Sequence, residues 1–125
     1  MSDSAEILRE LALLERVQAR LATIATRTDD QRRHDLIALR RELSQQIARV
    51  GQVADPIFAA ADVEIAREYR ARFSRMRSAA AMHQANWPAV RLGESAEAYR
   101  KSALAVREAN RDFVAWTRET LAALP

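Results

Sequence analysis

The clearest helical pattern in the chain lies in SAEAYRKSALAVREANRDFVAWTRETLAAL, residues 95–124. Within it, a row of mostly apolar side chains recurs in alternating steps of three and four residues. The row consists of Tyr99, Ala103, Val106, Asn110, Phe113, Thr117, Thr120 and Leu124. Such spacing places all of these side chains on one face of a helix. The pattern therefore predicts an amphipathic helix over residues 95–123.

Three more stretches show the same spacing and predict helices over residues 4–27, 31–53 and 56–85. Asp55-Pro56 is typical of a helix start, with an aspartate as N-cap and a proline at the first helical position. Trp87-Pro88 ends the third helix, because the residue before a proline avoids the helical conformation. Short connections favour antiparallel neighbours. We therefore predict an all-α fold, an up-down-up-down antiparallel four-helix bundle that forms one domain over residues 1–125.

The composition excludes several classes of site. The chain has no cysteine, which rules out disulfides, thiolate nucleophiles and cysteine-bound zinc. Its first residues lack the basic and apolar regions of a secretory signal, and no apolar run approaches the length of a membrane span. All basic residues except Lys101 are arginines, which is typical of a GC-rich bacterial genome. We expect a cytoplasmic bacterial protein, with no membrane association and, at a net charge of +3, no nucleic acid partner.

The residues needed for common kinds of catalysis are also missing. Di-iron sites in helical bundles use Glu-x-x-His pairs, but Gln31 precedes His34 by three residues and Ala80 precedes His83. Two glycines cannot build a phosphate-binding loop, and no Ser/His/Asp pattern is present. His83 lacks the lysine and glycine that follow the histidine of phosphotransfer bundles, so we interpret it as a packed histidine near a helix end. We expect no enzymatic activity, no metal and no cofactor.

Four polar residues fall on the predicted apolar faces, where leucine would be expected: Gln18, Asp62, Arg72 and Asn110. In an antiparallel bundle, residues equally distant from a shared turn lie at the same height. By this measure Gln18, Tyr69, Arg72 and Asn110 lie near mid-height, together with the stem of Arg40. One interpretation is a polar layer that fixes the register of the helices. The other is a pocket between the helices for a small anionic or polar ligand.

A second candidate site lies on the last helix and the segment before it. Arg100, Arg107, Arg111 and Arg118 form one ridge, which is either a solvated face or a docking surface for an acidic protein partner. Trp87 begins the irregular stretch before this helix. It either caps the core or serves as an exposed anchor for a partner.

The segment DLIALRREL, residues 35–43, follows a leucine-rich helix and a short acidic turn. It resembles flagellar export chaperones of the hook-junction type, and the likeness covers about the first fifty residues. The resemblance implies a small cytoplasmic helical protein that holds secretion substrates, and it implies no catalytic residue.

We therefore expect a non-enzymatic bundle that acts by protein–protein binding, as an adaptor or a chaperone-like protein. Two alternatives stay open at this point. One is a small-ligand-binding bundle with a polar pocket at mid-height. The other is a structural homodimer that uses the apolar residues Leu8, Leu13, Met82 and Leu104, which lie off the main faces.

Overall fold

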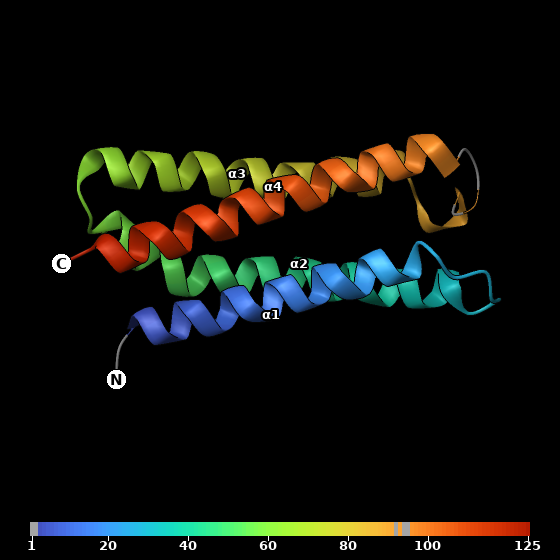
Figure 1. Ribbon diagram of the computed structural model, residues 1–125, viewed down its shortest axis with the longest axis horizontal. Coiled ribbons are helices and arrows are strands. Elements are labelled where there is room, and N and C mark those ends of the chain that lie inside the picture. Colours follow the sequence, from blue (N-terminus) through green and yellow to red (C-terminus); the bar gives the residue numbers. More distant parts are fainter. Residues whose placement is uncertain (1–2, 92, 94–95) are drawn as a thin grey trace.

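The computed structural model describes residues 3–91, 93 and 96–125, and all secondary structure in this part of the chain is helical. The elements are α1 (Asp3–Ile24), α2 (Arg32–Ala59), α3 (Val63–Asn86), the short 3-10 helix η1 (Ala89–Arg91) and α4 (Ala96–Ala123). The four long helices form an all-α four-helix bundle, as the sequence predicts (Figure 1).

The bundle consists of two antiparallel hairpins, α1 with α2 and α3 with α4, each more closely packed within itself than against the other. The start of α1 and the end of α4 lie at the same end as the α2–α3 turn (Figure 1). We call this the terminal end. The opposite end, which we call the loop end, holds the turn between α1 and α2, over residues 25–31, and η1.

The hydrophobic core is divided unequally along the bundle. The larger cluster includes Ile7, Leu11 and Leu14 of α1, and the rings of Phe58 and Phe113, all 0% exposed. A smaller cluster at the loop end is formed by Ile24, Leu36 and Leu39, with Leu21 and Tyr99 partly buried against it. Aliphatic residues at helical spacing thus join all four helices at the terminal end, while the loop end has a thinner interior.

The boundary between α2 and α3 differs from the prediction of a helix start at Asp55-Pro56. In the structure α2 continues through Pro56 to Ala59. Continuation keeps Val50, Ala54 and Phe58 on one buried face, each 0% exposed. Because this burial outweighs the hydrogen bond that a proline cannot donate, the local Asp-Pro signal does not end the helix.

Helix α3 begins at Val63, and Asp62 is its N-cap. The Asp62 side chain accepts a hydrogen bond from the backbone N–H of Glu64 at 2.7 Å. The assignment of Asp62 to an apolar face was therefore wrong, since a residue in the cap position precedes the helix and satisfies one of its free N–H groups. The other predicted boundaries differ from the observed ones by three residues or fewer.

Candidate binding cavity

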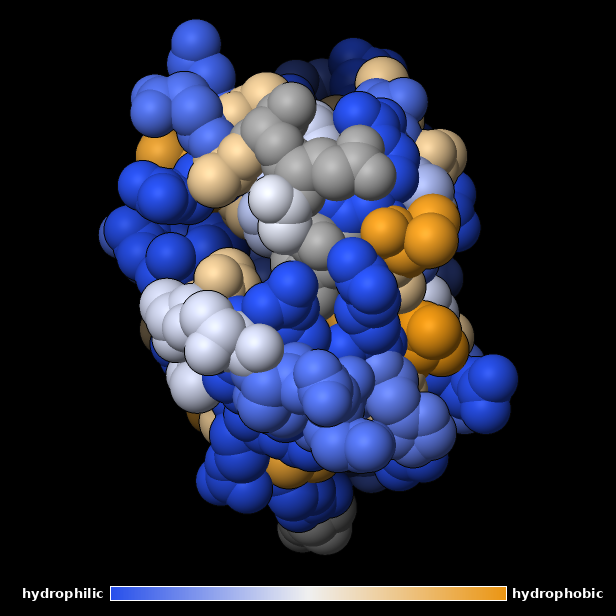
Figure 2. All heavy atoms as spheres, turned by 90° about the vertical axis from the view of Figure 1, so that its right-hand side faces the viewer, coloured by the Kyte–Doolittle hydropathy of each residue, from blue (hydrophilic) through white to orange (hydrophobic). Residues whose placement is uncertain are grey.

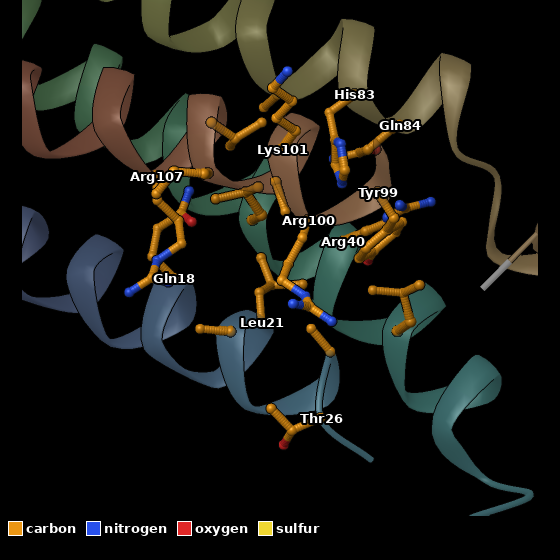
Figure 3. Close-up of a pocket in the computed structure, with 18 of the residues that line it drawn as sticks. Gln18, Leu21, Thr26, Arg40, His83, Gln84, Tyr99, Arg100, Lys101 and Arg107 are labelled. Carbon is orange, nitrogen blue, oxygen red and sulfur yellow. The ribbon is translucent and has the colours of Figure 1, made fainter. Parts of the chain in front are cut away.

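A cavity of about 600 Å³ lies near the loop end of the bundle. Residues from all four helices line it, among them Gln18 of α1, Arg40 of α2, His83 of α3 and Tyr99 of α4 (Figure 3). Sites for small ligands in proteins enclose about 300–1,000 Å³. The cavity is therefore of the size that a compact organic molecule requires.

Small side chains leave this space open. Ala22 of α1, Ala80 of α3 and Ala103 of α4 all line the cavity. At the terminal end the interior of the same bundle is filled by Phe58 and Phe113. Alanine ends at Cβ, so three helices that present alanine to one space cannot fill it unless they move closer together.

The mouth of the cavity lies between the end of α1 and the first half of α4. The exposed residues of the lining come mainly from these two segments, and they include Thr26, Arg100, Leu104 and Arg107. Figure 2 looks onto the adjoining loop end, where hydrophilic residues cover most of the surface and hydrophobic ones gather in separate patches. A ligand would therefore enter from the side of α4 that carries the arginines.

The charges around the cavity are mostly positive. The lining contains four basic residues and one acidic residue, Glu97. The basic ones are Arg40, Arg100, Lys101 and Arg107. In the part of the chain that the structure describes, none of these four takes part in an ion pair. The cavity thus presents a cationic rim and a cationic residue in its wall.

Gln18 is the buried polar residue of the lining that lacks a partner. Its side chain is only 8% exposed, and it makes no hydrogen bond to any described residue. A glutamine amide offers one acceptor oxygen and two N–H donors. The Gln18 amide is not among the fully buried atoms that lack a partner, so it reaches the open space of the cavity. The residue is thus suited to bind a group that enters the cavity.

Arg40 brings a second unsatisfied donor into the wall. Its Nη2 atom is buried and has no hydrogen-bond partner among the described residues. Burial lowers the pKa of Arg40, and the nearby Tyr99 partly offsets this effect. Since a free arginine ionises only far above neutral pH, the guanidinium still carries its charge.

His83 is held in its neutral form beside Arg40. Burial, followed by the positive charge of Arg40, lowers the pKa of His83 to about 4. Its Nδ1 lies 2.6 Å from the Ser102 hydroxyl, and its ring packs edge-on against Tyr99 at a centroid distance of 5.3 Å. The sequence predicts a packed histidine near a helix end, and the structure agrees with this prediction.

Of the four residues predicted to form a polar pocket, Gln18, Tyr69, Arg72 and Asn110, only Gln18 lines this cavity. Tyr69 is 3% exposed, and its hydroxyl donates a 2.5 Å hydrogen bond to Asp55. Asn110 is 4% exposed, and its Oδ1 atom has no partner among the described residues. The structure therefore places these polar groups in separate environments.

Arg72 lies at the edge of the bundle. Its guanidinium donates to Glu68 at 2.6 Å and to Asp112 of α4 at 2.8 Å, and it lies 5.6 Å from the Trp116 ring. Its side chain is 25% exposed. The pair with Asp112 thus links α3 to α4, while Glu68 belongs to α3 itself, and the stem of Arg72 lies along apolar surface.

Trp87 packs over the loop end of the core. Its side chain is buried, with the Tyr99 ring at 5.6 Å in an edge-on arrangement and the Arg91 guanidinium 4.4 Å above its face. This placement fits the interpretation as a cap on the core, because a buried ring offers little surface to a partner.

The predicted ridge of Arg100, Arg107, Arg111 and Arg118 is divided in the structure. Arg100 and Arg107 line the mouth of the cavity. Arg118 forms two hydrogen bonds to Glu15 of α1, at 2.7 and 3.1 Å. Arg111 is exposed and does not line the cavity. Only the first two residues of the ridge therefore belong to the candidate site.

The sequence patterns also missed a buried carboxylate, Glu10 of α1. It is 5% exposed and accepts a 2.7 Å hydrogen bond from the Gln46 side chain, which also donates to the Glu10 carbonyl at 3.0 Å. Arg49 lies 3.4 Å from the same carboxylate. Because the protein itself satisfies this group, we assign it to the packing of α1 against α2.

Comparison with protein-family models, curated proteins and solved structures gives no match for this chain. Among the described residues, no helix is both long and apolar enough to cross a membrane. The same residues contain no group of three or more histidine, aspartate or glutamate side chains placed to hold a metal ion. The interpretation of the cavity therefore rests on its geometry and chemistry.

Proposed function

We propose that the protein is a non-catalytic, small-ligand-binding four-helix bundle whose ligand occupies the loop-end cavity. The observation that carries this proposal is the environment of Gln18. Only 8% of this residue is exposed, its side chain has no hydrogen-bond partner among the described residues, and it lines a cavity of about 600 Å³. Arg40 lines the same cavity, and its Nη2 atom is buried without a partner among the described residues. Proteins satisfy such atoms with water or a ligand where their own residues do not.

The apolar walls also favour a ligand. Leu21, Leu36 and Leu43 line the cavity beside the alanines. Ligand sites combine walls of this kind with a few polar groups that fix orientation. Apolar surface facing an open cavity forfeits packing contacts, and a ligand with an apolar body would restore them.

We propose no catalytic step in this cavity. Its only carboxylate, Glu97, is exposed, and its histidine, His83, has Nδ1 engaged with Ser102. A general acid or base must lie within hydrogen-bond reach of the reacting group, and these two side chains do not form an acid–base pair with a nucleophile. Binding is therefore the function that these side chains support.

Binding of a protein partner is the second candidate, and it includes the chaperone-like role that the resemblance in residues 35–43 implies. It is favoured by Leu104, which is 50% exposed between Arg100 and Arg107 at the mouth. A partner helix would, however, need an open apolar groove along several turns. The volume of about 600 Å³ and the lining from all four helices fit a small molecule better.

The proposal can be tested with a substitution that fills the cavity, by measuring the binding of a neutral apolar dye, N-phenylnaphthylamine. Ala103→Leu extends a side chain into the cavity, whereas Ala105→Leu adds the same group on the exposed face of α4. We expect the dye to fluoresce with the wild-type protein and with Ala105→Leu. Its affinity for Ala103→Leu should fall about tenfold or more, a loss of about 1.4 kcal/mol.

Ala103→Leu should also raise the midpoint of thermal unfolding, because added methyl groups fill empty space. This second measurement separates a filled cavity from a misfolded variant. Equal dye binding by both variants, with each of them folded, would refute the proposed site.

A further inference from the structure

We propose that the ligand is an amphipathic anion, with its apolar body in the cavity and its anionic head group between Arg100 and Arg107 at the mouth. This inference rests on the proposed function, and it adds the chemical class and the orientation of the ligand. The shared chemistry of the head group is a carboxylate or a phosphate.

The two arginines are placed to hold such a head group. Arg107 follows Arg100 by seven positions on α4, so the two lie on the same face, about 10 Å apart along the helix axis. Figure 3 shows Arg100 extending from α4 toward the side of the cavity where Leu21 of α1 lies. Neither arginine forms an ion pair with a described residue, whereas Arg118 on the same ridge is bound to Glu15.

The other charged residues of the lining also favour an anionic ligand. Lys101 and Arg40 add two positive charges to the lining, against the one carboxylate of Glu97. Burial, and then the charge of Arg40, lower the pKa of His83, so this histidine adds no acidic group to the cavity. A cationic ligand would be repelled here, and an anionic one attracted.

The residues inside the cavity indicate the chemistry of the ligand body. Leu36, Leu43 and Val106 offer apolar walls, and Gln18 is the uncharged polar group among them. An ionised head group beside Gln18 would lose its hydration, because glutamine does not balance a charge. Arg40 is a single half-buried cation in the wall, whereas Arg100 and Arg107 are two exposed cations at the mouth. The head group therefore belongs at the exposed mouth, and Gln18 is left to bind a neutral oxygen or a water on the ligand body.

The experiment compares three probes with the same alkyl chain, decanoate, decanol and decylammonium, by isothermal titration calorimetry on the full chain. We expect decanoate to bind at least tenfold more tightly than decanol, and decylammonium to bind more weakly than decanol. Arg100→Gln and Arg107→Gln should each weaken decanoate about five- to tenfold and leave decanol unchanged, because each removes a charge-assisted hydrogen bond.

Arg111→Gln is the matched control, since Arg111 is exposed on the same ridge and does not line the cavity. It should bind all three probes like the wild-type protein. An equal loss of decanoate binding in Arg111→Gln would show that only the net charge of the helix matters, and would overturn the inference.

The possible outcomes separate this inference from the proposed function. If decanol or decylammonium binds as tightly as decanoate, and Ala103→Leu abolishes that binding, the function stands and the anionic ligand is wrong. If neither the dye nor any alkyl probe binds, both proposals fail. Binding to phosphatidylglycerol vesicles without binding of free decanoate would also overturn the inference, and would assign the arginines to a lipid surface.

Discussion

Tyr69 and Gln18 are both polar residues buried on helix faces, but the protein satisfies only the first. The Tyr69 hydroxyl donates to Asp55, and burial, followed by this hydrogen bond, raises its pKa above the ordinary value. Gln18 has no such partner in the described part of the chain. At the scale of single residues, an unpaired polar group beside a cavity is thus a stronger sign of a binding site than polarity on an apolar face alone.

His83 gives a prediction about the pH dependence of stability. Its pKa is about 4 in the folded protein and 6.5 in the unfolded chain, so the unfolded chain binds the extra proton between these values. The contribution of His83 to the free energy of unfolding is therefore complete above pH 6.5, and it is lost as the pH falls toward 4. Because His83 is only half-buried, solvent screening reduces the effect, and we expect a contribution of about 1 kcal/mol.

The measurement is the free energy of unfolding by urea at several pH values between 4 and 7. His83→Gln keeps a side chain that can bond Ser102 but removes the titration, so its stability should fall less in this range than that of the wild-type protein. The groups that face His83 are Arg40 from α2 and Tyr99 and Ser102 from α4. A His34→Gln control replaces an exposed histidine of α2 and should follow the wild-type profile. Identical profiles for wild-type and His83→Gln would contradict the prediction.

At the scale of elements, the periodicity of the apolar residues was enough to predict four helices and most of their buried faces. It misplaced the α2–α3 boundary because Asp55-Pro56 has the local form of a helix start. The choice between the two boundaries depends on whether Ala54 and Phe58 are buried on α2, which is a property of packing. Local signals and burial conflict at this one connection, and burial is the stronger term.

The observed boundary predicts opposite effects for two substitutions near the connection. Pro56→Ala should stabilise the protein by about 1 kcal/mol, since alanine can donate the missing hydrogen bond inside α2 and this gain exceeds the loss of proline's restraint on the unfolded chain. Asp62→Ala should destabilise it by about 1 kcal/mol through loss of the N-cap. Both free energies can be measured by urea unfolding.

Asp62→Asn is the control for the second substitution, because asparagine also caps helices and should retain most of the stability. If α3 instead began at Pro56, Pro56→Ala would be neutral or destabilising, and Asp62→Ala would have little effect. That pair of results would restore the boundary predicted from the sequence.

The candidate site could be predicted only in part, for a reason that also lies in packing. Gln18 stands out in the sequence because it is polar on an apolar face. Ala80 and Ala103 occupy ordinary positions on their faces, and periodicity does not show whether an alanine meets a neighbouring helix or an open space. Likewise, the sequence does not show that Arg72 pairs with Glu68 and Asp112 while Arg100 stays unpaired. The cavity arises where alanines of three helices face the same space, which depends on the whole assembly.

For the molecule as a whole, the two hairpins are held together unevenly. The large core cluster and the Arg118–Glu15 pair join them toward the terminal end. Near the loop end, the cavity takes the place of side chains that would bridge α1 and α4. Local opening requires less free energy where fewer apolar contacts must be broken.

We therefore expect the first half of α4 to open more readily than the second half. Native-state hydrogen exchange should show protection factors at least about tenfold lower for amides of residues 100–107 than for amides of residues 110–121, which corresponds to an opening free energy about 1.4 kcal/mol smaller. In Ala103→Leu, which fills the cavity, protection of residues 100–107 should rise toward that of the second half, while Ala105→Leu should leave it unchanged.

Uniform protection along α4 in the wild-type protein would show that the cavity does not weaken the contact between the hairpins. The same experiment with decanoate connects both proposals to this motion, because a ligand that bridges α1 and α4 must slow local exchange in the first half of α4.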